Sequence, residues 1–364
     1  MNNDLKYQIV KDFIISKIRK QELKPTDLVP SERELSQKFD ISQSTVVRAL
    51  RELVQSEVLY RIQGKGTFVA DYSKNKPKTI GILMLDKPTM VTTSAQISLF
   101  EKMKYLMTEL NICGYTLSFF TVTESIIQEK ICDKILKENT VGGIIMFSKK
   151  ELEKAIDIFK KENYPYVVLY DNELDESIEA VTIDDEYGAY EATKYLIGLG
   201  HKKIGIICSP LTICCYKQRM LGYKKALQES GIEIDENLIK IASVGGSEGG
   251  YMGMLELLKL KNLPSAVFCC SDFKASGAME AIKEKNLSIP KDISIVGFDG
   301  LEFSKQLQPP LTTVQIPHSE ISKEGIKMLT TWITDKKPKV YKKIIKPSLV
   351  IRESATKKYK TERQ

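Results

Sequence analysis

Gln43, Ser44 and Arg48 carry side chains that can hydrogen-bond to nucleic acid, and their spacing places them on one face of a predicted helix. Lys65 lies between Gly64 and Gly66 at the tip of a predicted hairpin, where glycines permit a tight turn and one ammonium is presented. Two helices followed by a glycine-tipped hairpin have the layout of a winged helix-turn-helix. The segment 30–70 therefore predicts binding to double-stranded DNA.

The elements that must hold these residues are marked by capping residues and apolar spacing. Ser31 and Glu34 form a capping box, which predicts a helix that begins after Pro30. Ser42 can cap the next helix, whose apolar residues recur at helical spacing and face the core. The hairpin over residues 60–69 forms the wing.

Three motifs in this segment resemble the GntR family of bacterial repressors. PSEREL, SxSTVxRAL and QGKGTFV occur in the order and at the spacing of that family, over roughly the first fifth of the chain. The resemblance implies contacts to phosphates or base edges from the two helices and to the minor groove from the wing. The implied contact residues are Arg33, Ser44, Thr45, Arg48, Gln63, Gly64, Lys65 and Gly66, and Gln43 is a further candidate at a position where the chain departs from the family.

Two positions depart from the family pattern. The family usually has arginine where this chain has Gln43, and often another arginine where it has Val47. Glutamine can pair with the adenine edge, and valine can contact a thymine methyl group. We therefore predict an operator that is rich in A·T pairs at these bases; the alternative interpretation is that both are tolerated surface residues.

Composition and charge describe a globular chain of two or three domains. The hydrophobic content of 42% suffices for a full core, no apolar run approaches the roughly 20 residues needed to cross a membrane, and the first residues lack a secretory signal. We therefore predict a cytoplasmic protein with no membrane partner. Of the net charge of +7, residues 1–73 carry little, with 12 Lys and Arg against 10 Asp and Glu, whereas residues 336–364 carry 11 Lys and Arg against 2 acids, so the basic excess lies there.

The cysteines and histidines indicate neither a metal site nor a catalytic site. The seven cysteines have no zinc-finger spacing and no CxxC pair, and the two histidines, His201 and His318, are far apart in the sequence. We therefore predict no metal, no cofactor and no enzyme activity.

Beyond residue 79, short apolar runs alternate with amphipathic stretches. This alternation predicts an α/β fold with parallel sheets, and the pattern restarts after a break at 172–179, which predicts two lobes with a ligand cleft between them. The predicted parts are a DNA-binding domain at 1–71, a linker at 72–78, the two-lobed domain at 79–354 and a basic tail at 355–364.

The two-lobed part resembles the LacI-type effector-binding domain, which has a periplasmic-binding-protein-like fold. The matching landmarks are TIGILMLD, VTIDDEYGAYEATKYLIGLGHKKIGII, RMLGY, AVFCCSDFKASGAM and ISIVGFDG. The resemblance implies three crossings of the chain between lobes, near residues 172, 297 and 314. It also implies dimerisation through this domain.

Charged residues that follow these landmarks are candidates for ligand binding. By resemblance, Arg219 matches the ligand arginine and Asp272 the ligand carboxylate, while Asp299 either binds the ligand or braces a crossing. Arginine and carboxylates can each bind two adjacent hydroxyl groups of a sugar. The first lobe offers candidates for the opposite wall at the ends of its apolar runs, namely Asp86, Lys87, Ser148 and Tyr170.

Together these features predict a GntR/LacI hybrid regulator. Such a protein is a homodimer that represses transcription from a two-fold operator, and a small carbohydrate in the cleft controls its affinity for DNA. The hybrid architecture suggests arabinose as one effector. The alternative is a cytoplasmic sugar-binding protein or enzyme with a vestigial DNA-binding domain.

Overall fold

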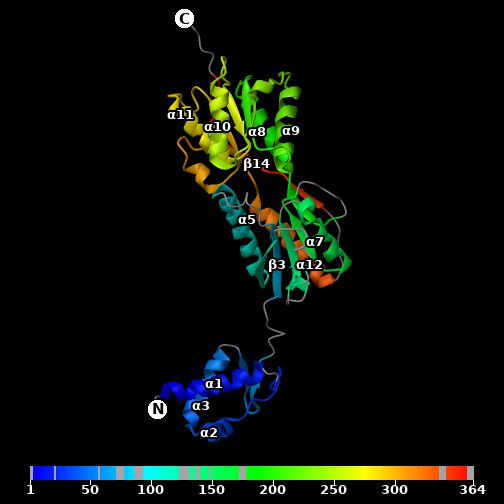
Figure 1. Ribbon diagram of the computed structural model, residues 1–364, viewed down its shortest axis with the longest axis vertical. Coiled ribbons are helices and arrows are strands. Elements are labelled where there is room, and N and C mark those ends of the chain that lie inside the picture. The colour runs from blue at the N-terminus through cyan, green and yellow to red at the C-terminus, as the bar shows by residue number, and fades with distance from the viewer. Residues whose placement is uncertain are drawn as a thin grey trace. The chain divides into compact units, whose positions relative to one another are not determined.

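The computed structural model describes residues 3–19, 22–55, 58–70, 78–85, 93–122, 131–132, 134–136, 140–146, 149–171, 178–335 and 342–358. It divides into two compact units, Met1–Pro77 and Lys78–Gln364 (Figure 1). The predicted linker at 72–78 lies outside the described residues except for Lys78, which begins a strand. Of the predicted tail, 359–364 also lies outside them.

The first unit is a winged helix-turn-helix. Its elements are α1 (Asn3–Arg19), α2 (Glu32–Phe39), α3 (Gln43–Gln55), β1 (Leu59–Ile62) and β2 (Gly66–Val69). β1 and β2 pair antiparallel from Leu59↔Val69 to Ile62↔Gly66. Leu28 adds a bridge to Phe68 and so closes the base of the wing.

The capping residues of the sequence start α2 and α3. The backbone N–H of Glu34 donates to Oγ of Ser31 at 3.2 Å, and the carboxylate of Glu34 accepts from the backbone N–H of Ser31 at 2.7 Å. The N–H of Thr45 donates to Oγ of Ser42 at 3.3 Å. Both helices therefore begin where the capping pattern predicts.

Helix α1 was not predicted, although its sequence contains a helical pattern. Val10 and Ile14 lie one turn apart and are fully buried, in a cluster that includes Leu35 of α2 and Leu50 of α3. The helix-turn-helix would expose this apolar surface without α1, because two short helices and a hairpin cannot enclose a core alone.

The first lobe of the second unit is a parallel sheet covered by helices. Its strand order is β13-β7-β6-β5-β3-β4. The strands are β3 (Lys78–Leu85), β4 (Tyr115–Val122), β5 (Thr140–Met146), β6 (Tyr166–Leu169), β7 (Ala180–Ile183) and β13 (Lys342–Ile345). The helices are α5 (Thr93–Ile112), α7 (Lys149–Lys161) and α12 (His318–Asp335) (Figure 1).

The second lobe has the same design, with one antiparallel strand at its edge. Its strand order is β14-β12-β11-β10-β8-β9, and β14 runs antiparallel to β12. The strands are β8 (Ile204–Cys208), β9 (Ile239–Ile241), β10 (Ala266–Cys269), β11 (Ser294–Asp299), β12 (Thr312–Gln315) and β14 (Ser348–Val350). The helices are α8 (Asp185–Gly198), α9 (Cys214–Glu229), α10 (Gly246–Leu258) and α11 (Asp272–Glu284), and two short 3₁₀ turns lie at Glu236–Leu238 and Glu302–Lys305.

The chain crosses between the lobes at positions that differ from two of the three predicted ones. β7 still pairs in the first sheet, so the first crossing follows Ile183 rather than residue 172. Residue 297 lies inside β11, between β10 and β12 of the second sheet, and is not a crossing. The chain leaves the second sheet after Gln315 to form α12, and returns between β13 and β14.

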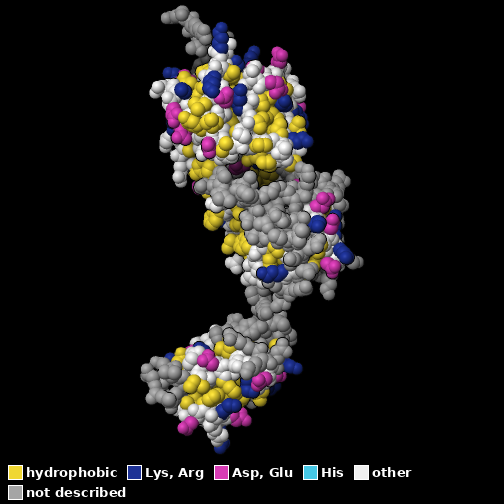
Figure 2. Space-filling model, viewed as in Figure 1, with side chains coloured by type: hydrophobic (Ala, Val, Ile, Leu, Met, Phe, Trp, Pro, Cys, Tyr) yellow, Lys and Arg dark blue, Asp and Glu magenta, His cyan; other side chains and the backbone are white. Residues whose placement is uncertain are grey.

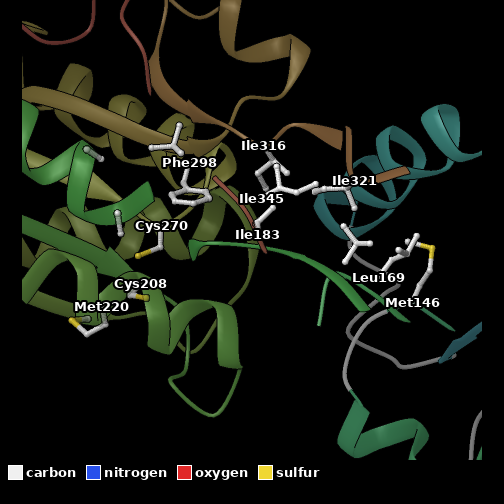
Figure 3. Packing of buried hydrophobic residues seen from close by; sticks show 14 of the residues in the cluster. Met146, Leu169, Ile183, Cys208, Met220, Cys270, Phe298, Ile316, Ile321 and Ile345 are labelled. Carbon is white, nitrogen blue, oxygen red and sulfur yellow. The ribbon is translucent and has the colours of Figure 1, made fainter. Parts of the chain in front are cut away.

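These crossings give the two lobes a shared apolar core. Figure 3 shows part of one buried cluster that runs from Met146 and Leu169 of the first lobe to Cys208, Cys270 and Phe298 of the second. Residues at the three crossings lie between these ends, namely Ile183, Ile316, Ile321 and Ile345. Packing therefore continues through the segments that join the lobes.

Glycines allow α10 and α11 to pack in close contact. A Cβ atom at Gly250 would lie 2.0 Å from the carbonyl oxygen of Lys274, and one at Gly277 would lie 1.8 Å from that of Ser247. The glycine-rich start of α10 therefore packs directly against the start of α11.

Candidate effector site and DNA-binding surface

Arg219 lies at the carboxyl ends of the second sheet, where it is held by three oxygen atoms. Its Nε donates to Oδ1 of Asp185 at 2.7 Å, and its Nη1 donates to the carbonyl of Cys270 at 2.5 Å and to Oδ1 of Asp299 at 3.2 Å. Burial disfavours the charged guanidinium, but the two carboxylates outweigh burial and raise the pKa of Arg219 well above its usual value. Arg219 is therefore a permanent cation in this site.

An aromatic ring fixes the plane of this guanidinium. Cζ of Arg219 lies 3.6 Å from the ring centroid of Phe298, which belongs to β11. Figure 3 shows Phe298 at the same end of the buried cluster as Cys270. The ring covers one face of the guanidinium, and the ring of Tyr216 lies 5.6 Å from Cζ.

Asp185 is a site residue that was not among the predicted ligand contacts. It is the first residue of α8, directly after the helix cap Asp184, whose carboxylate accepts from the N–H of Tyr187 at 2.9 Å. A carboxylate is stabilised at a helix N-terminus by the helix dipole. Asp184 therefore caps α8, and Asp185 binds Arg219.

Asp299 ends β11 and combines an unusual backbone conformation with partial exposure. Its φ of +115° lies outside the range that residues with a side chain usually adopt, and Gly300 follows with a φ of +72°. Burial raises the pKa of Asp299, and the charge of Arg219 opposes this shift. The strained turn aims a carboxylate at Arg219 from the strand next to β10.

Asp272, by contrast, is fully buried and bonded within the protein. Its Oδ2 accepts from the N–H of Leu301 at 2.7 Å, and its Oδ1 accepts from the hydroxyl of Thr313 at 2.5 Å. Burial and the charge of Asp299 both raise the pKa of Asp272 well above its usual value. In this structure Asp272 connects α11 to the turn after β11 and to β12.

The first lobe contributes Lys102 and Tyr170 to the region that faces Arg219. Nζ of Lys102 lies 4.8 Å from the ring centroid of Tyr170, whose hydroxyl is hydrogen-bonded to Nδ1 of His318 at 3.0 Å. Burial lowers the pKa of Lys102, although the charge of Asp299 raises it. Lys102, on α5, therefore interacts electrostatically with a carboxylate of the other lobe. Three further candidates lie outside the described residues, namely Asp86, Lys87 and Ser148.

His201 has a structural environment. Its Nδ1 lies 2.9 Å from Oγ of Ser265, and its Nε2 lies 3.0 Å from the carbonyl oxygen of Thr356. These contacts join the start of β8 to the end of the described chain. Burial lowers the pKa of His201, so the imidazole favours its neutral form.

In the first unit, the polar residues of α3 lie opposite its buried face. Val46, Ala49, Leu50 and Leu53 are buried, whereas Gln43, Ser44, Arg48 and Arg51 are exposed. The hydroxyl of Ser42 is 2.9 Å from that of Ser44 and 2.8 Å from that of Thr45. The helix thus presents a row of polar groups of the size and spacing that suit a major groove.

The predicted phosphate contacts border this row. Arg33 is exposed on α2. Cζ of Arg48 lies 4.5 Å from the ring centroid of Tyr7, and its Nε lies 3.5 Å from a carboxylate oxygen of Glu52. These contacts support the arginine side chain while 56% of it remains exposed.

The tip of the wing is an exposed turn. The N–H of Lys65 donates to the carbonyl of Ile62 at 3.1 Å, and Gly64 has a φ of +76°. Gly66 has a φ of +118°, and a Cβ atom there would lie 2.7 Å from Cδ1 of Leu28. Gln63 and Lys65 are exposed on this turn.

Comparison with known proteins identifies the family. A family model for bacterial regulatory proteins of the gntR family matches residues 6–69, and one for a periplasmic binding protein-like domain matches residues 193–355. A LacI family transcriptional regulator from Enterococcus faecium with bound ribose is 25% identical, with a TM-score of 0.65 over 78% of this chain and 100% of that one. The HTH-type transcriptional repressor PurR of Haemophilus influenzae is 33% identical over 291 residues, which cover 77% of this chain and 82% of that repressor.

The chain belongs to the GntR/LacI hybrid regulators.

Another relative of this hybrid regulator matches it over a shorter stretch. The ribose operon repressor of Haemophilus influenzae is 41% identical over 167 residues, which cover 46% of the hybrid regulator and 50% of that repressor. These relatives are transcriptional regulators, and the hybrid regulator is a DNA-binding transcriptional regulator. Within the described ranges, no helix is both long and apolar enough to span a bilayer.

Proposed function

We propose that this regulator is a homodimeric repressor whose affinity for a two-fold operator is controlled by a small carbohydrate bound between its lobes. The observation that carries the proposal is the held guanidinium of Arg219. Asp185, Asp299 and the carbonyl of Cys270 fix its direction, and Phe298 fixes its plane. A preoriented guanidinium beside a carboxylate can bind adjacent hydroxyl groups of a sugar.

The position of the Arg219 guanidinium supports a carbohydrate as the effector. The carboxyl ends of parallel strands form the ligand-binding edge in open α/β sheets, and the residues around Arg219 lie at the ends of β10 and β11 or at the start of α8. The relatives named for the ribose operon and for bound ribose support a sugar as effector. Arabinose remains one candidate of this class.

The proposed ligand contacts are Arg219 and Asp299 from the second lobe and Tyr170 from the first. Asp272 is not among them, because both of its oxygens already accept hydrogen bonds within the protein. Asp86, Lys87 and Ser148 stay predictions for the wall of the first lobe. Closure over a sugar would bring the two groups of residues together.

An apolar surface on the first lobe supports the homodimer. Ile97, Phe100, Met107 and Ile112 are exposed on α5, and Phe119 is exposed on the edge strand β4. The side chain of Phe100 is 69% exposed. Figure 2 shows hydrophobic side chains gathered over the part of the lobe where Figure 1 places α5. A second copy of the chain would cover this surface and would also provide the second wing that a two-fold operator requires.

Operator binding is proposed to depend on the exposed residues of α2, α3 and the wing. Gln43 and Ser44 would contact bases, and Arg33, Arg48 and the wing tip at 63–66 would contact phosphates and the minor groove. An operator that is rich in A·T pairs at the bases facing Gln43 follows from its amide. Selection of binding sites from random DNA tests this preference, and G·C pairs at those bases would contradict it.

Reciprocal coupling provides the test of the whole proposal. The affinity for a sugar is measured by calorimetry with the free protein and with the protein saturated with operator DNA. If the sugar controls DNA binding, operator must change sugar affinity by the same factor by which sugar changes operator affinity, typically about 5- to 150-fold. Equal sugar affinities in the two titrations would refute the control of DNA binding.

A further inference from the structure

A lysine that the sequence did not single out lies within the proposed effector site. Lys274 is the third residue of α11, and its side chain, at 1% exposure, is almost completely buried. Its backbone is fixed by Ser271, whose Oγ accepts from the N–H of Lys274 at 3.2 Å, and by the close approach of Gly250. The start of α11 therefore has little freedom to move this side chain out of the protein.

The groups around the ammonium of Lys274 are poor partners for a buried cation. Its Nζ lies 5.9 Å from the ring centroid of Tyr216, and burial lowers the pKa of Lys274 while the nearby thiols of Cys270, Cys208 and Cys269 and the carboxylate of Asp299 raise it. Thiols are weak hydrogen-bond acceptors. Among the residues that the structure describes, no ion pair joins Lys274 to a carboxylate.

The nearby carboxylates are already shared by other cations. Asp185 and Asp299 both bind Arg219, and Asp299 also acts on Lys102 from the first lobe. Asp272 is fully buried and faces Leu301 and Thr313. Within the described part of the site, Lys274 therefore shares the charge of Asp299 with Arg219 and Lys102, and it forms no ion pair of its own with a carboxylate.

The burial of the Lys274 ammonium is what a binding site for an anion would show. Burial lowers the pKa of Lys274, because a buried ammonium loses its hydration. An anionic group in contact with Nζ would accept hydrogen bonds from the ammonium and favour its charged form. A long apolar residue would fill the same volume at lower cost if the position had only to complete the core.

We propose that the effector is an anionic carbohydrate, a sugar that carries a phosphate or carboxylate group, and that Lys274 binds this group. The proposal rests on the carbohydrate control proposed above and deepens it. Arg219 and Asp299 would bind the hydroxyl groups, and Lys274, near the start of α11, would bind the charged substituent. Lys274 is then the residue that separates charged sugars from their neutral parents.

Matched compounds test the charge requirement. The full chain is titrated by calorimetry with ribose and ribose 5-phosphate, with arabinose and arabinose 5-phosphate, and with glucose, glucose 6-phosphate and glucuronate. We expect an anionic compound to bind at least tenfold more tightly than its neutral parent. The phosphate and carboxylate derivatives of glucose distinguish the two sources of negative charge. Tighter binding of the neutral parents, or no binding of any anionic compound, would overturn the proposal.

Variants of Lys274 test the residue. Lys274→Met preserves length and removes the charge, and Lys274→Gln preserves polarity, so one of them can serve if the other fails to fold. Each should lower affinity for the anionic sugar at least tenfold and change affinity for its neutral parent much less. Lys283→Met is the matched control, because Lys283 is exposed on the same helix. Unchanged affinity for the anionic sugar in both Lys274 variants would overturn the proposal.

Operator binding, measured in the presence of the same compounds, tests carbohydrate control of DNA binding separately from the anionic nature of the effector. If a neutral sugar binds and changes operator affinity, carbohydrate control survives and the anionic effector is refuted. If an anionic sugar binds through Lys274 without any change in operator affinity, the anionic site survives and carbohydrate control is refuted.

Discussion

Nε of Arg219 donates to Oδ1 of Asp185 across 2.7 Å, and this ion pair joins the middle of α9 to the first residue of α8. The two side chains are 6% and 0% exposed. The pair therefore orients the guanidinium before any ligand arrives, and its removal should affect both stability and effector binding.

Replacement of Arg219 by methionine should destabilise the second unit. The change removes the guanidinium from a buried carboxylate, and breaking a buried ion pair in this way costs about 3–5 kcal/mol. Thermal and urea unfolding followed by circular dichroism measure the loss. The double variant Asp185→Asn with Arg219→Met should recover part of it, since the fully buried Asp185 then carries no unpaired charge, while Asp299 still lacks the arginine. Additive losses in the double variant would show that the two side chains act independently.

Replacement of Arg33 or Arg48 by alanine should weaken operator binding and reduce its salt dependence. Each lost phosphate contact should lower the slope of log affinity against log salt by roughly 0.9. Fluorescence anisotropy at several salt concentrations measures both quantities. Lys24→Ala is a control within the same unit, because Lys24 is exposed and precedes both DNA-binding helices. Unchanged affinity and slope in both arginine variants would favour the interpretation of a vestigial DNA-binding domain.

His318 should make the second unit less stable in mild acid. Burial lowers the pKa of His318 to about 3, whereas an unfolded histidine takes up a proton below about pH 6.5. The unfolded state therefore binds more protons between these values, and the free energy of unfolding should fall by about 2 kcal/mol from pH 7.5 to pH 5 on account of His318. Trp332, the only tryptophan in the sequence, is buried in the same helix and reports unfolding by fluorescence.

His318→Asn is the variant for this measurement, because its amide can preserve a hydrogen bond to Tyr170. The variant should show a correspondingly flatter dependence of stability on pH. The same measurement on His201→Asn shows how much of the pH dependence comes from His201, since burial also lowers the pKa of His201. The prediction fails if the wild-type protein and His318→Asn lose equal stability between pH 7.5 and pH 5.

Replacement of Phe100 by aspartate should shift the homodimer toward monomer. The change removes an exposed aromatic side chain from the proposed interface and places a charge there, at a cost of roughly 2–4 kcal/mol, or about 30- to 1000-fold in the dimer dissociation constant. Sedimentation analysis measures the shift. Ile351→Asp changes another exposed apolar residue of the second unit and should leave the dimer intact. Equal dissociation constants for Phe100→Asp and wild type would exclude α5 from the interface.

Local sequence signals predicted the secondary structure well where the physical cause was local. The capping box of Ser31 and Glu34 marks the start of α2, because its hydrogen bonds span three residues. Alternating apolar runs predicted the strands and helices up to β11. Apolar spacing does not mark the exact start of a helix such as α10, whose first turn is rich in glycine.

The roles of the carboxylates could not be predicted from local signals. Asp272 and Asp299 follow strands in similar contexts, yet one is enclosed by Leu301 and Thr313 while the other reaches Arg219. Packing between β11, β12 and α11 decides this difference. Asp185 lies 34 residues before Arg219 in the chain, and Lys274 becomes notable only when its burial among thiols is known.

Because both lobes are completed by segments near the C-terminus, neither lobe can finish folding until translation has nearly ended. The first lobe lacks α12 and β13 until residue 345 has been made, and the second lobe lacks its edge strand until residue 350. A ribosome that has translated both DNA-binding helices, and even most of both sheets, therefore still holds two incomplete lobes. The winged unit can fold early on the nascent chain, but the effector site can close only when translation is almost finished.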